Sequence, residues 1–174
     1  ILISSNLERM LFFFFFNNDK EVASMQAQLS NEGTFTVSDE IKNGIDKLFW
    51  AGCCDDAKTV ATIGKYFNEY GYLCDTHTAV AMNVYEQYVK ETGEDIPTVI
   101  ASTASPYKFA KSVLSAVTEK QAETEFDNVR LLSELTSTEI PEPIKALENA
   151  TVRFNEVCEK QDMLKSVYNA LNIK

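Results

Sequence analysis

Hydrophobic residues recur every three or four positions along most of the chain, which is the spacing of one face of an α-helix. N-cap residue types precede several of these stretches and glycines follow them, with Ser38, Asp75 and Ser105 at starts and Gly33, Gly71 and Gly93 at ends. The pattern predicts helices over 7–16, 19–29, 38–49, 55–70, 75–92, 105–117, 144–150 and 161–173.

Three short apolar segments predict β-strands, at 1–3, 97–102 and 152–157. The middle segment, PTVIAS, lies between turn signals and is expected to be buried. Strands flanked by helices favour α/β layering over a helical bundle. The sequence therefore predicts an α/β fold, rich in helix with few short strands. A length of 174 residues predicts one domain over 1–174.

The run from Met10 to Phe16 is entirely apolar. It is far shorter than the ~20 residues that cross a bilayer. Its length suits the core of a signal peptide, but Glu8 and Arg9 directly precede it and no A-x-A site follows. We instead expect a helix that is buried on most faces, although five consecutive phenylalanines could exceed what a local core can cover.

Acidic residues outnumber basic ones by 26 to 16, which gives a formal charge of −10. A surface of this sign repels the phosphates of nucleic acids and the headgroups of anionic membranes. Nucleic acid and membranes are therefore not expected partners. A small phosphorylated ligand stays compatible with the charge, because a local pocket can oppose the net value.

The cysteine pattern does not favour a metal site. The chain has one histidine, no CxxC pair, and four cysteines, at Cys53, Cys54, Cys74 and Cys158. Reduced thiols in a cytoplasmic protein are the simplest interpretation. Generic catalytic motifs are also missing, since the six glycines are scattered and form neither GxGxxG nor a P-loop, and there is no G-x-S-x-G. Pattern alone predicts only an acidic α/β domain.

Four strings, in order along the chain, resemble motifs of the threonine synthases. Residues 101–109, ASTASPYKF, are similar to S-T-A-x-P-x-K-F, and residues 71–81, GYLCDTHTAVA, to G-Y-x-x-D-P-H-T-A-V-A. Residues 3–11, ISSNLERML, resemble S-N-x-E-R-L-L, and residues 49–52 resemble F-x-A-G. Thr76 departs from the pattern, because the family usually has proline there.

The resemblance implies the C-terminal portion of a fold type II enzyme that uses pyridoxal phosphate (PLP). Such an enzyme converts O-phosphohomoserine and water into threonine and phosphate. In the family, the N-terminal half supplies the Schiff-base lysine and the glycine-rich loop around the cofactor phosphate. The chain begins at Ile1 within an apolar stretch, so we expect a fragment that packs on a missing N-terminal half and is inactive alone.

Thr103 is the expected cofactor contact, with Ser102 beside it. The resemblance implies that the threonine hydroxyl is the hydrogen-bond partner of the pyridine nitrogen of PLP. Thr103 also follows an expected strand and precedes a helix, the place where α/β folds put ligand-binding groups. The alternative is that Ser102, Thr103 and Ser105 only cap the next helix. Both can hold, with Ser105 as the cap and Thr103 as the ligand.

Asp75, His77 and Asn6 are expected near the cleft or the substrate. For Asp75 the alternative is an N-cap with Thr78 near the third helical position, and we favour it. For His77 the two interpretations are even. Asn6, with Ser5 and Arg9, lies at a helix start that could approach a phosphate, although a capped structural helix is the simpler explanation. The helix start at Lys108 suggests a surface residue rather than the Schiff-base lysine.

Two other functions stay open. The phenylalanine run could form an aromatic packing face of a non-catalytic interaction or structural domain. The chain could also belong to another PLP enzyme of the same fold type, but the D-x-H-T-A-V-A string favours threonine synthase.

Overall fold

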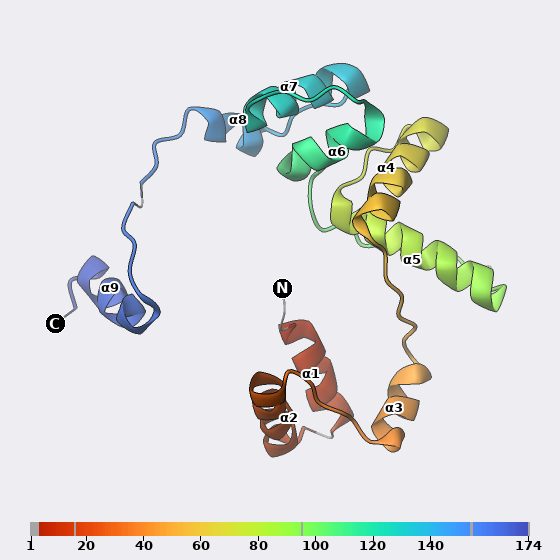
Figure 1. Cartoon of the computed structure of the whole chain (residues 1–174), viewed down its shortest axis with the longest axis vertical. Helices are drawn as coiled ribbons and strands as arrows, with labels where there is room; N and C mark the ends of the chain where they lie inside the picture. Colours follow the sequence, from red (N-terminus) through yellow and green to blue (C-terminus); the bar gives the residue numbers. More distant parts are fainter. Residues whose placement is uncertain (1–3, 16, 95, 154, 174) are drawn as a thin grey trace. The chain divides into compact units, whose positions relative to one another are not determined.

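The computed structural model describes residues 4–15, 17–94, 96–153 and 155–173 (Figure 1). Its elements are α-helices and two short 3-10 helices: α1 (Ser5–Phe14), α2 (Asp19–Glu32), α3 (Asp39–Asp46), α4 (Asp56–Tyr70), α5 (Thr76–Thr92), η1 (Pro106–Phe109), α6 (Ala110–Val117), α7 (Glu125–Thr136), α8 (Glu142–Glu148), η2 (Lys160–Asp162) and α9 (Met163–Ala170). The helix-rich part of the expected fold is confirmed.

The expected strands are not confirmed, since the described residues contain no β-strand. The segment 97–102 is not buried, because Val99 is 96% exposed. A strand forms where a neighbour pairs with its backbone N–H and C=O groups, and no described segment does so here. The predicted strand at 1–3 lies outside the described residues, as does residue 154 of the strand predicted at 152–157.

The chain divides into two compact units, Ile1–Asp55 with Val80–Val99, and Asp56–Ala79 with Ile100–Lys174. The expectation of one domain stays a prediction.

In the first unit, α1 packs on α2 and α3. Its core is formed by Leu11, Val22 and Met25, with Phe12, Phe15, Phe35, Val37 and Ile45 packed around it. The apolar run is only partly covered, because Phe13 is 70% exposed. The expected burial of this helix on most faces is therefore wrong for Phe13. The other expectation, that the run exceeds what the local core covers, is confirmed for this residue.

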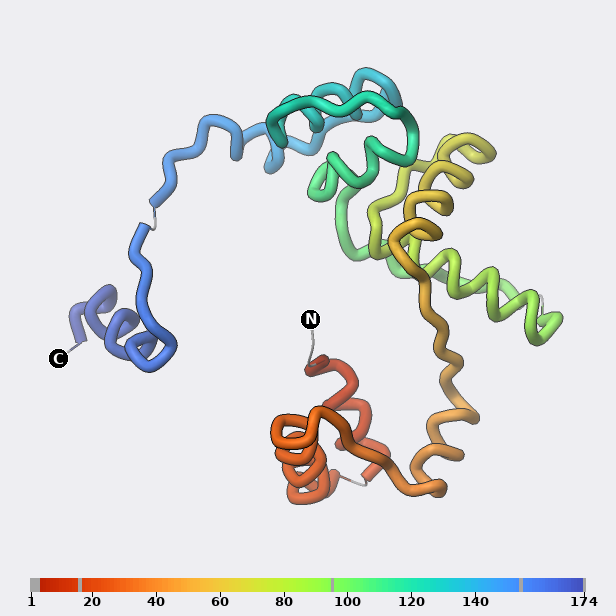
Figure 2. Tube along the Cα trace, viewed as in Figure 1, coloured from red at the N-terminus to blue at the C-terminus, as the bar shows by residue number. Residues whose placement is uncertain are grey.

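In the second unit, α6 lies between α4 and α7 and packs on both (Figure 2). The buried apolar side chains of these three helices include Ile63, Val113, Leu114, Val129 and Leu132. The helix start signals at Ser38 and Ser105 are confirmed, since each side chain accepts a backbone N–H of its helix. Gly33, Gly71 and Gly93 follow their helices at positive φ, as the stop signals predict.

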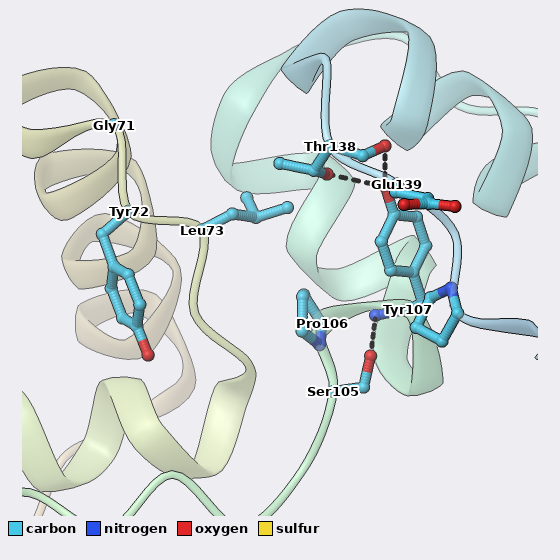
Figure 3. A pocket seen from close by; sticks show the side chains of 9 residues that line it. Gly71, Tyr72, Leu73, Ser105, Pro106, Tyr107, Thr138 and Glu139 are labelled. Carbon is cyan, nitrogen blue, oxygen red and sulfur yellow. Dashed lines mark hydrogen bonds between the residues drawn. The ribbon is translucent and has the colours of Figure 1, made fainter.

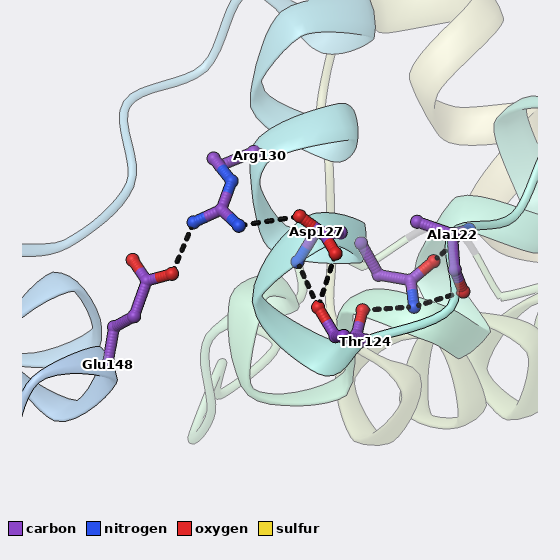
Figure 4. A network of polar contacts seen from close by, with 6 residues as sticks. Ala122, Thr124, Asp127, Arg130 and Glu148 are labelled. Atoms are coloured by element: carbon purple, nitrogen blue, oxygen red, sulfur yellow. Dashed lines mark hydrogen bonds and ion pairs between the residues drawn. The ribbon is translucent and has the colours of Figure 1, made fainter.

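A polar network fixes the start of α7 (Figure 4). Thr124 caps the helix by accepting the N–H of Asp127 at 3.1 Å. Buried Asn128 accepts the N–H of Ala122 at 2.9 Å and donates to the carbonyls of Ala122 and Thr124. Arg130 joins Asp127 to Glu148 at the end of α8, with both N–O distances at 2.5 Å. The loop before α7 and the end of α8 are thereby tied to one helix.

The final amphipathic helix is present as η2 and α9. Neither contains a buried residue, and apolar side chains such as Leu164 and Leu171 are about 60% exposed (61% and 62%).

Candidate functional site

The candidate site in the second unit begins at Asp75, which directly precedes α5. Its side chain is fully buried. Asp75 Oδ1 accepts the backbone N–H of His77 at 2.8 Å and of Thr78 at 3.2 Å. These are two of the amides that an α-helix leaves unpaired at its start. The N-cap interpretation of Asp75 is therefore confirmed. A substrate contact of Asp75 stays a prediction.

Thr78 connects Asp75 to a segment 24 residues further along the chain. The Thr78 side chain is 2% exposed, and its hydroxyl donates to Asp75 Oδ2. The same hydroxyl lies 3.1 Å from Ser102 Oγ. A hydroxyl has one proton, so with that proton directed at the carboxylate, Ser102 is the donor to Thr78. The three side chains form one hydrogen-bonded chain from Ser102 through Thr78 to Asp75.

Thr103 follows this chain directly. Its side chain is exposed, and among the described residues its hydroxyl has no hydrogen-bond partner. Two residues later, Ser105 Oγ accepts the N–H of Tyr107 at 3.3 Å and begins η1, with Pro106 at its first position. The two sequence interpretations thus fall on different residues, with Ser105 as the cap and Thr103 left accessible for a ligand. The cofactor role of Thr103 stays a prediction.

An open groove of about 320 Å³ lies beside Ser105 and Tyr107 (Figure 3). The Tyr107 hydroxyl donates to the carbonyl of Thr138 at 2.8 Å and lies 2.6 Å from Thr138 Oγ1. Glu139 is the only charged residue among the described residues that line the groove. An anionic rim does not favour a phosphate, so this groove is a poor site for a phosphorylated substrate.

His77 and Lys108 both lie near the aromatic ring of Phe109. The His77 ring meets Phe109 edge to face at a centroid distance of 5.2 Å, and Lys108 Nζ lies 6.0 Å from the Phe109 centroid. Both His77 and Lys108 are exposed, which agrees with the surface position expected of Lys108. The role of His77 in a cleft stays a prediction.

Asn6 belongs to the other unit. It lies in the first turn of α1 and is exposed. Ser4 caps that helix by accepting the N–H of Leu7, and Arg9 donates to Ser5 Oγ at 3.4 Å. This is the arrangement of a capped structural helix. A substrate contact of Asn6 stays a prediction.

Cys74 and the Thr78–Ser102 contact are features that the sequence did not reveal. Cys74 is 1% exposed, and burial raises the pKa of its thiol to about 11, with a further contribution from the Asp75 carboxylate. It therefore stays a neutral thiol at physiological pH. The only sequence signal for its burial is its place directly before a capping aspartate. No local pattern indicates that two hydroxyls 24 residues apart meet.

No group of histidine, cysteine or acidic side chains in the described part of the chain could hold a metal ion. Within the same residues, every helix is too short or too polar to cross a membrane.

Comparison with known proteins gives consistent matches. Residues 78–167 match the family described as threonine synthase, C-terminal. The chain is 31% identical over 121 residues to threonine synthase-like 1 of Macaca fascicularis and 32% identical over 116 residues to threonine synthase of Pseudomonas aeruginosa. These matches cover 70% and 67% of the chain but only 16% and 24% of those relatives.

A solved structure is also similar, that of PLP-bound threonine synthase from Brucella melitensis. The TM-score is 0.59 at 31% identity, over 79% of this chain and 28% of the other. The chain therefore spans about a quarter or less of the length of the first curated relatives that it matches.

Proposed function

Because the chain belongs to the threonine synthase family, we propose that it supplies the part of a PLP-dependent threonine synthase that contacts the pyridine ring. The full enzyme would convert O-phosphohomoserine and water into threonine and phosphate. The observation that carries the proposal is the exposed Thr103 hydroxyl, which has no described partner and directly follows the hydrogen-bonded Ser102.

The chemistry of this hydroxyl fits the cofactor. PLP, when bound, supplies the electron sink for the carbanion chemistry of the reaction. The Thr103 hydroxyl can donate to or accept from the ring nitrogen, and unlike a carboxylate it does not strongly favour a protonated ring. The adjacent Ser102 hydroxyl is already engaged by Thr78. We therefore assign the ring contact to Thr103 and a supporting position to Ser102.

We further propose that residues 1–174 are inactive by themselves. The relatives that carry the activity in their names are about four to six times longer than the matched region. The resemblance places the Schiff-base lysine in the N-terminal half. That half is the proposed packing partner of this chain, and measurable threonine formation from O-phosphohomoserine by residues 1–174 alone would contradict this part of the proposal.

The test of the ring contact is Thr103→Val in a full-length threonine synthase that carries this chain. Valine keeps the shape and removes the hydroxyl, so turnover should fall roughly 3- to 10-fold, as expected for one lost hydrogen bond, and PLP absorbance should shift. Thr103→Ser should retain both. Thr98→Val is a matched control, because Thr98 is exposed and its hydroxyl donates to Ile96 O two residues away. Unchanged absorbance and turnover in Thr103→Val would overturn the assignment.

We also propose a cytoplasmic location. Cys53, Cys74 and Cys158 are free thiols, and Cys53 and Cys158 are exposed. Exposed free thiols suit a reducing compartment.

A second candidate function is a non-catalytic interaction domain. Its support is an apolar groove of about 330 Å³ in the first unit, lined by Met10, Phe13, Phe14, Leu48 and Phe49. Leu48 is 74% exposed and Phe49 52%. Large exposed apolar surfaces are typical of interfaces. Size-exclusion chromatography at several concentrations tests this function. Phe13→Ser should reduce association if this groove is used, whereas Val99→Ser, at an even more exposed apolar site outside the groove, should not.

A further inference from the structure

We propose that Asp75 and Thr78 are positioning residues that hold Ser102 and the adjacent Thr103 in place. The inference rests on the proposed function for its catalytic meaning, because Thr103 is the residue assigned to the pyridine nitrogen. Its structural part rests on the hydrogen-bonded chain of Asp75, Thr78 and Ser102.

The Asp75 side chain, at one end of that series of hydrogen bonds, is held in place. Asp75 is fully buried, and Oδ1 is held by two amides at the start of α5. A carboxylate held at one oxygen by a helix start has its other oxygen directed at a fixed point. That second oxygen, Oδ2, takes the proton of Thr78.

The hydrogen bond between Thr78 and Ser102 sets the orientation of the Ser102 hydroxyl. Because the single proton of the Thr78 hydroxyl goes to Asp75, only its lone pairs remain for Ser102. Ser102 Oγ must then point its own proton at Thr78. The buried carboxylate of Asp75 thus sets the direction of the Ser102 hydroxyl, which lies on a different segment, through Thr78.

The segment that receives this link has little else to fix it. Residues 97–104 pair with no described strand, and Val99 is 96% exposed. Among the described residues, the Ser102–Thr78 contact is the one hydrogen bond that joins 97–104 to another element. Since Thr103 is the next residue, anchoring Ser102 restricts where the Thr103 backbone can go. The hydrogen bonds of Asp75, Thr78 and Ser102 therefore restrict the positions that the Thr103 hydroxyl can take.

Backbone amide relaxation by NMR on residues 1–174 tests the positioning directly. In the unaltered chain, the order parameter of the Thr103 amide should lie near the rigid-backbone value of about 0.85, and in Ser102→Ala it should fall toward about 0.6. Ser102 is exposed, so this variant removes the donor without opening the core. Thr78→Val should have the same effect, and Thr78→Ser, which keeps the hydroxyl, should restore the rigid value.

Thr98→Val is the matched control, because it removes a threonine hydroxyl from the same segment without touching the chain of hydrogen bonds. The amides of α6 and α7 report whether each variant is folded. A rigid Thr103 in a folded Ser102→Ala chain would overturn the inference, even if Thr78→Val failed to fold.

The full-length enzyme separates this inference from the proposed function. If both hold, Ser102→Ala should lower turnover roughly 3- to 10-fold with KM for O-phosphohomoserine unchanged, and the affinity for PLP should fall by a similar factor. If Thr103→Val alters the PLP spectrum but Ser102→Ala and Thr78→Val leave it unchanged, positioning is wrong and the function stands. If the order parameter of the Thr103 amide falls in Ser102→Ala while Thr103→Val leaves the PLP spectrum unchanged, the positioning of Thr103 is confirmed and its cofactor role is wrong.

Discussion

Gly64 in α4 lies directly against the backbone carbonyl of Ala116 in α6. A Cβ atom added at Gly64 would come within 2.8 Å of that oxygen. Side chains can move aside at such a distance, but a helix backbone cannot do so without shifting the whole element. The absence of a side chain at Gly64 therefore allows α4 and α6 to approach closely, and this contact supports the unit that contains Thr78 and Ser102.

Gly64→Ala should destabilise the protein. The overpacking cost of about 1–3 kcal/mol should exceed the roughly 1 kcal/mol that alanine gains over glycine in a helix. The matched control is Gly44→Ala in α3, where the new Cβ would meet only the edge of the Phe14 ring at 3.3 Å. That variant should be close to neutral. Urea unfolding of both variants measures the difference, and an equally stable Gly64→Ala would contradict the close approach.

The helix boundaries could be predicted because their causes are local. Ser38 and Ser105 bond to amides two or three residues away, and Gly71 adopts positive φ where α4 has ended. Ile63 and Tyr70 lie seven residues apart on one apolar stripe of α4, but this spacing does not specify which of them is buried. Ile63 is fully buried, but Tyr70 of the same apolar stripe is 69% exposed. Thr59, Thr62 and Gly64 are buried instead, because close contact with α6 selects small residues.

The site was predictable only in part, for the same reason. Asp75 as an N-cap is a local feature and is confirmed. The contact of Thr78 with Ser102 depends on how two distant segments fold together, and no spacing rule contains that information. The strand predicted at 97–102 failed because an apolar run becomes a strand only beside a partner, and an apolar run does not specify one.

Asn128→Ala should destabilise the second unit. Asn128 is 1% exposed and satisfies the N–H and C=O of Ala122 and the C=O of Thr124. Removing the amide leaves these groups without their partner, at a cost of roughly 1–3 kcal/mol. Asn169→Ala, at an exposed position in α9, should change the free energy of unfolding by no more than about 0.5 kcal/mol. Denaturant titration measures the free energy of unfolding of both variants. Equal losses in the two would show that the Asn128 network is not a source of stability.

Cys74 should be the least reactive thiol in the folded protein. It is 1% exposed, and burial followed by the charge of Asp75 raises its pKa to about 11, so almost no thiolate is present at pH 8. Exposed Cys53 and Cys158 should react rapidly with a disulfide reagent, whereas Cys74 should react only after unfolding. Mass spectrometry of the labelled chain identifies the sites. Rapid modification of Cys74 without denaturant would contradict its burial.

The same thiol should make stability depend on alkaline pH. The unfolded thiol loses its proton near pH 9, whereas the folded one keeps it up to about pH 11. The native state then binds more protons than the unfolded state, so the free energy of unfolding falls as pH rises through this window. Cys74→Ala should remove this part of the slope, and Cys53→Ala should not. Identical pH profiles for the two variants between pH 8 and pH 11 would contradict the raised pKa.

The C-terminal helix α9 should contribute little to the stability of the rest of the chain. Leu132 in α7 is fully buried, whereas Leu164 in α9 is 61% exposed. Leu132→Ala removes packed methyl groups from the core and should cost about 2–5 kcal/mol, while Leu164→Ala should stay within about 0.5 kcal/mol. The two substitutions are chemically identical, so helix propensity cancels and only burial differs. Thermal unfolding of both variants provides the comparison. If Leu164→Ala lowered the melting temperature as much as Leu132→Ala, then the apolar side of α9 would be packed in solution, and the expectation that α9 adds little stability would be wrong.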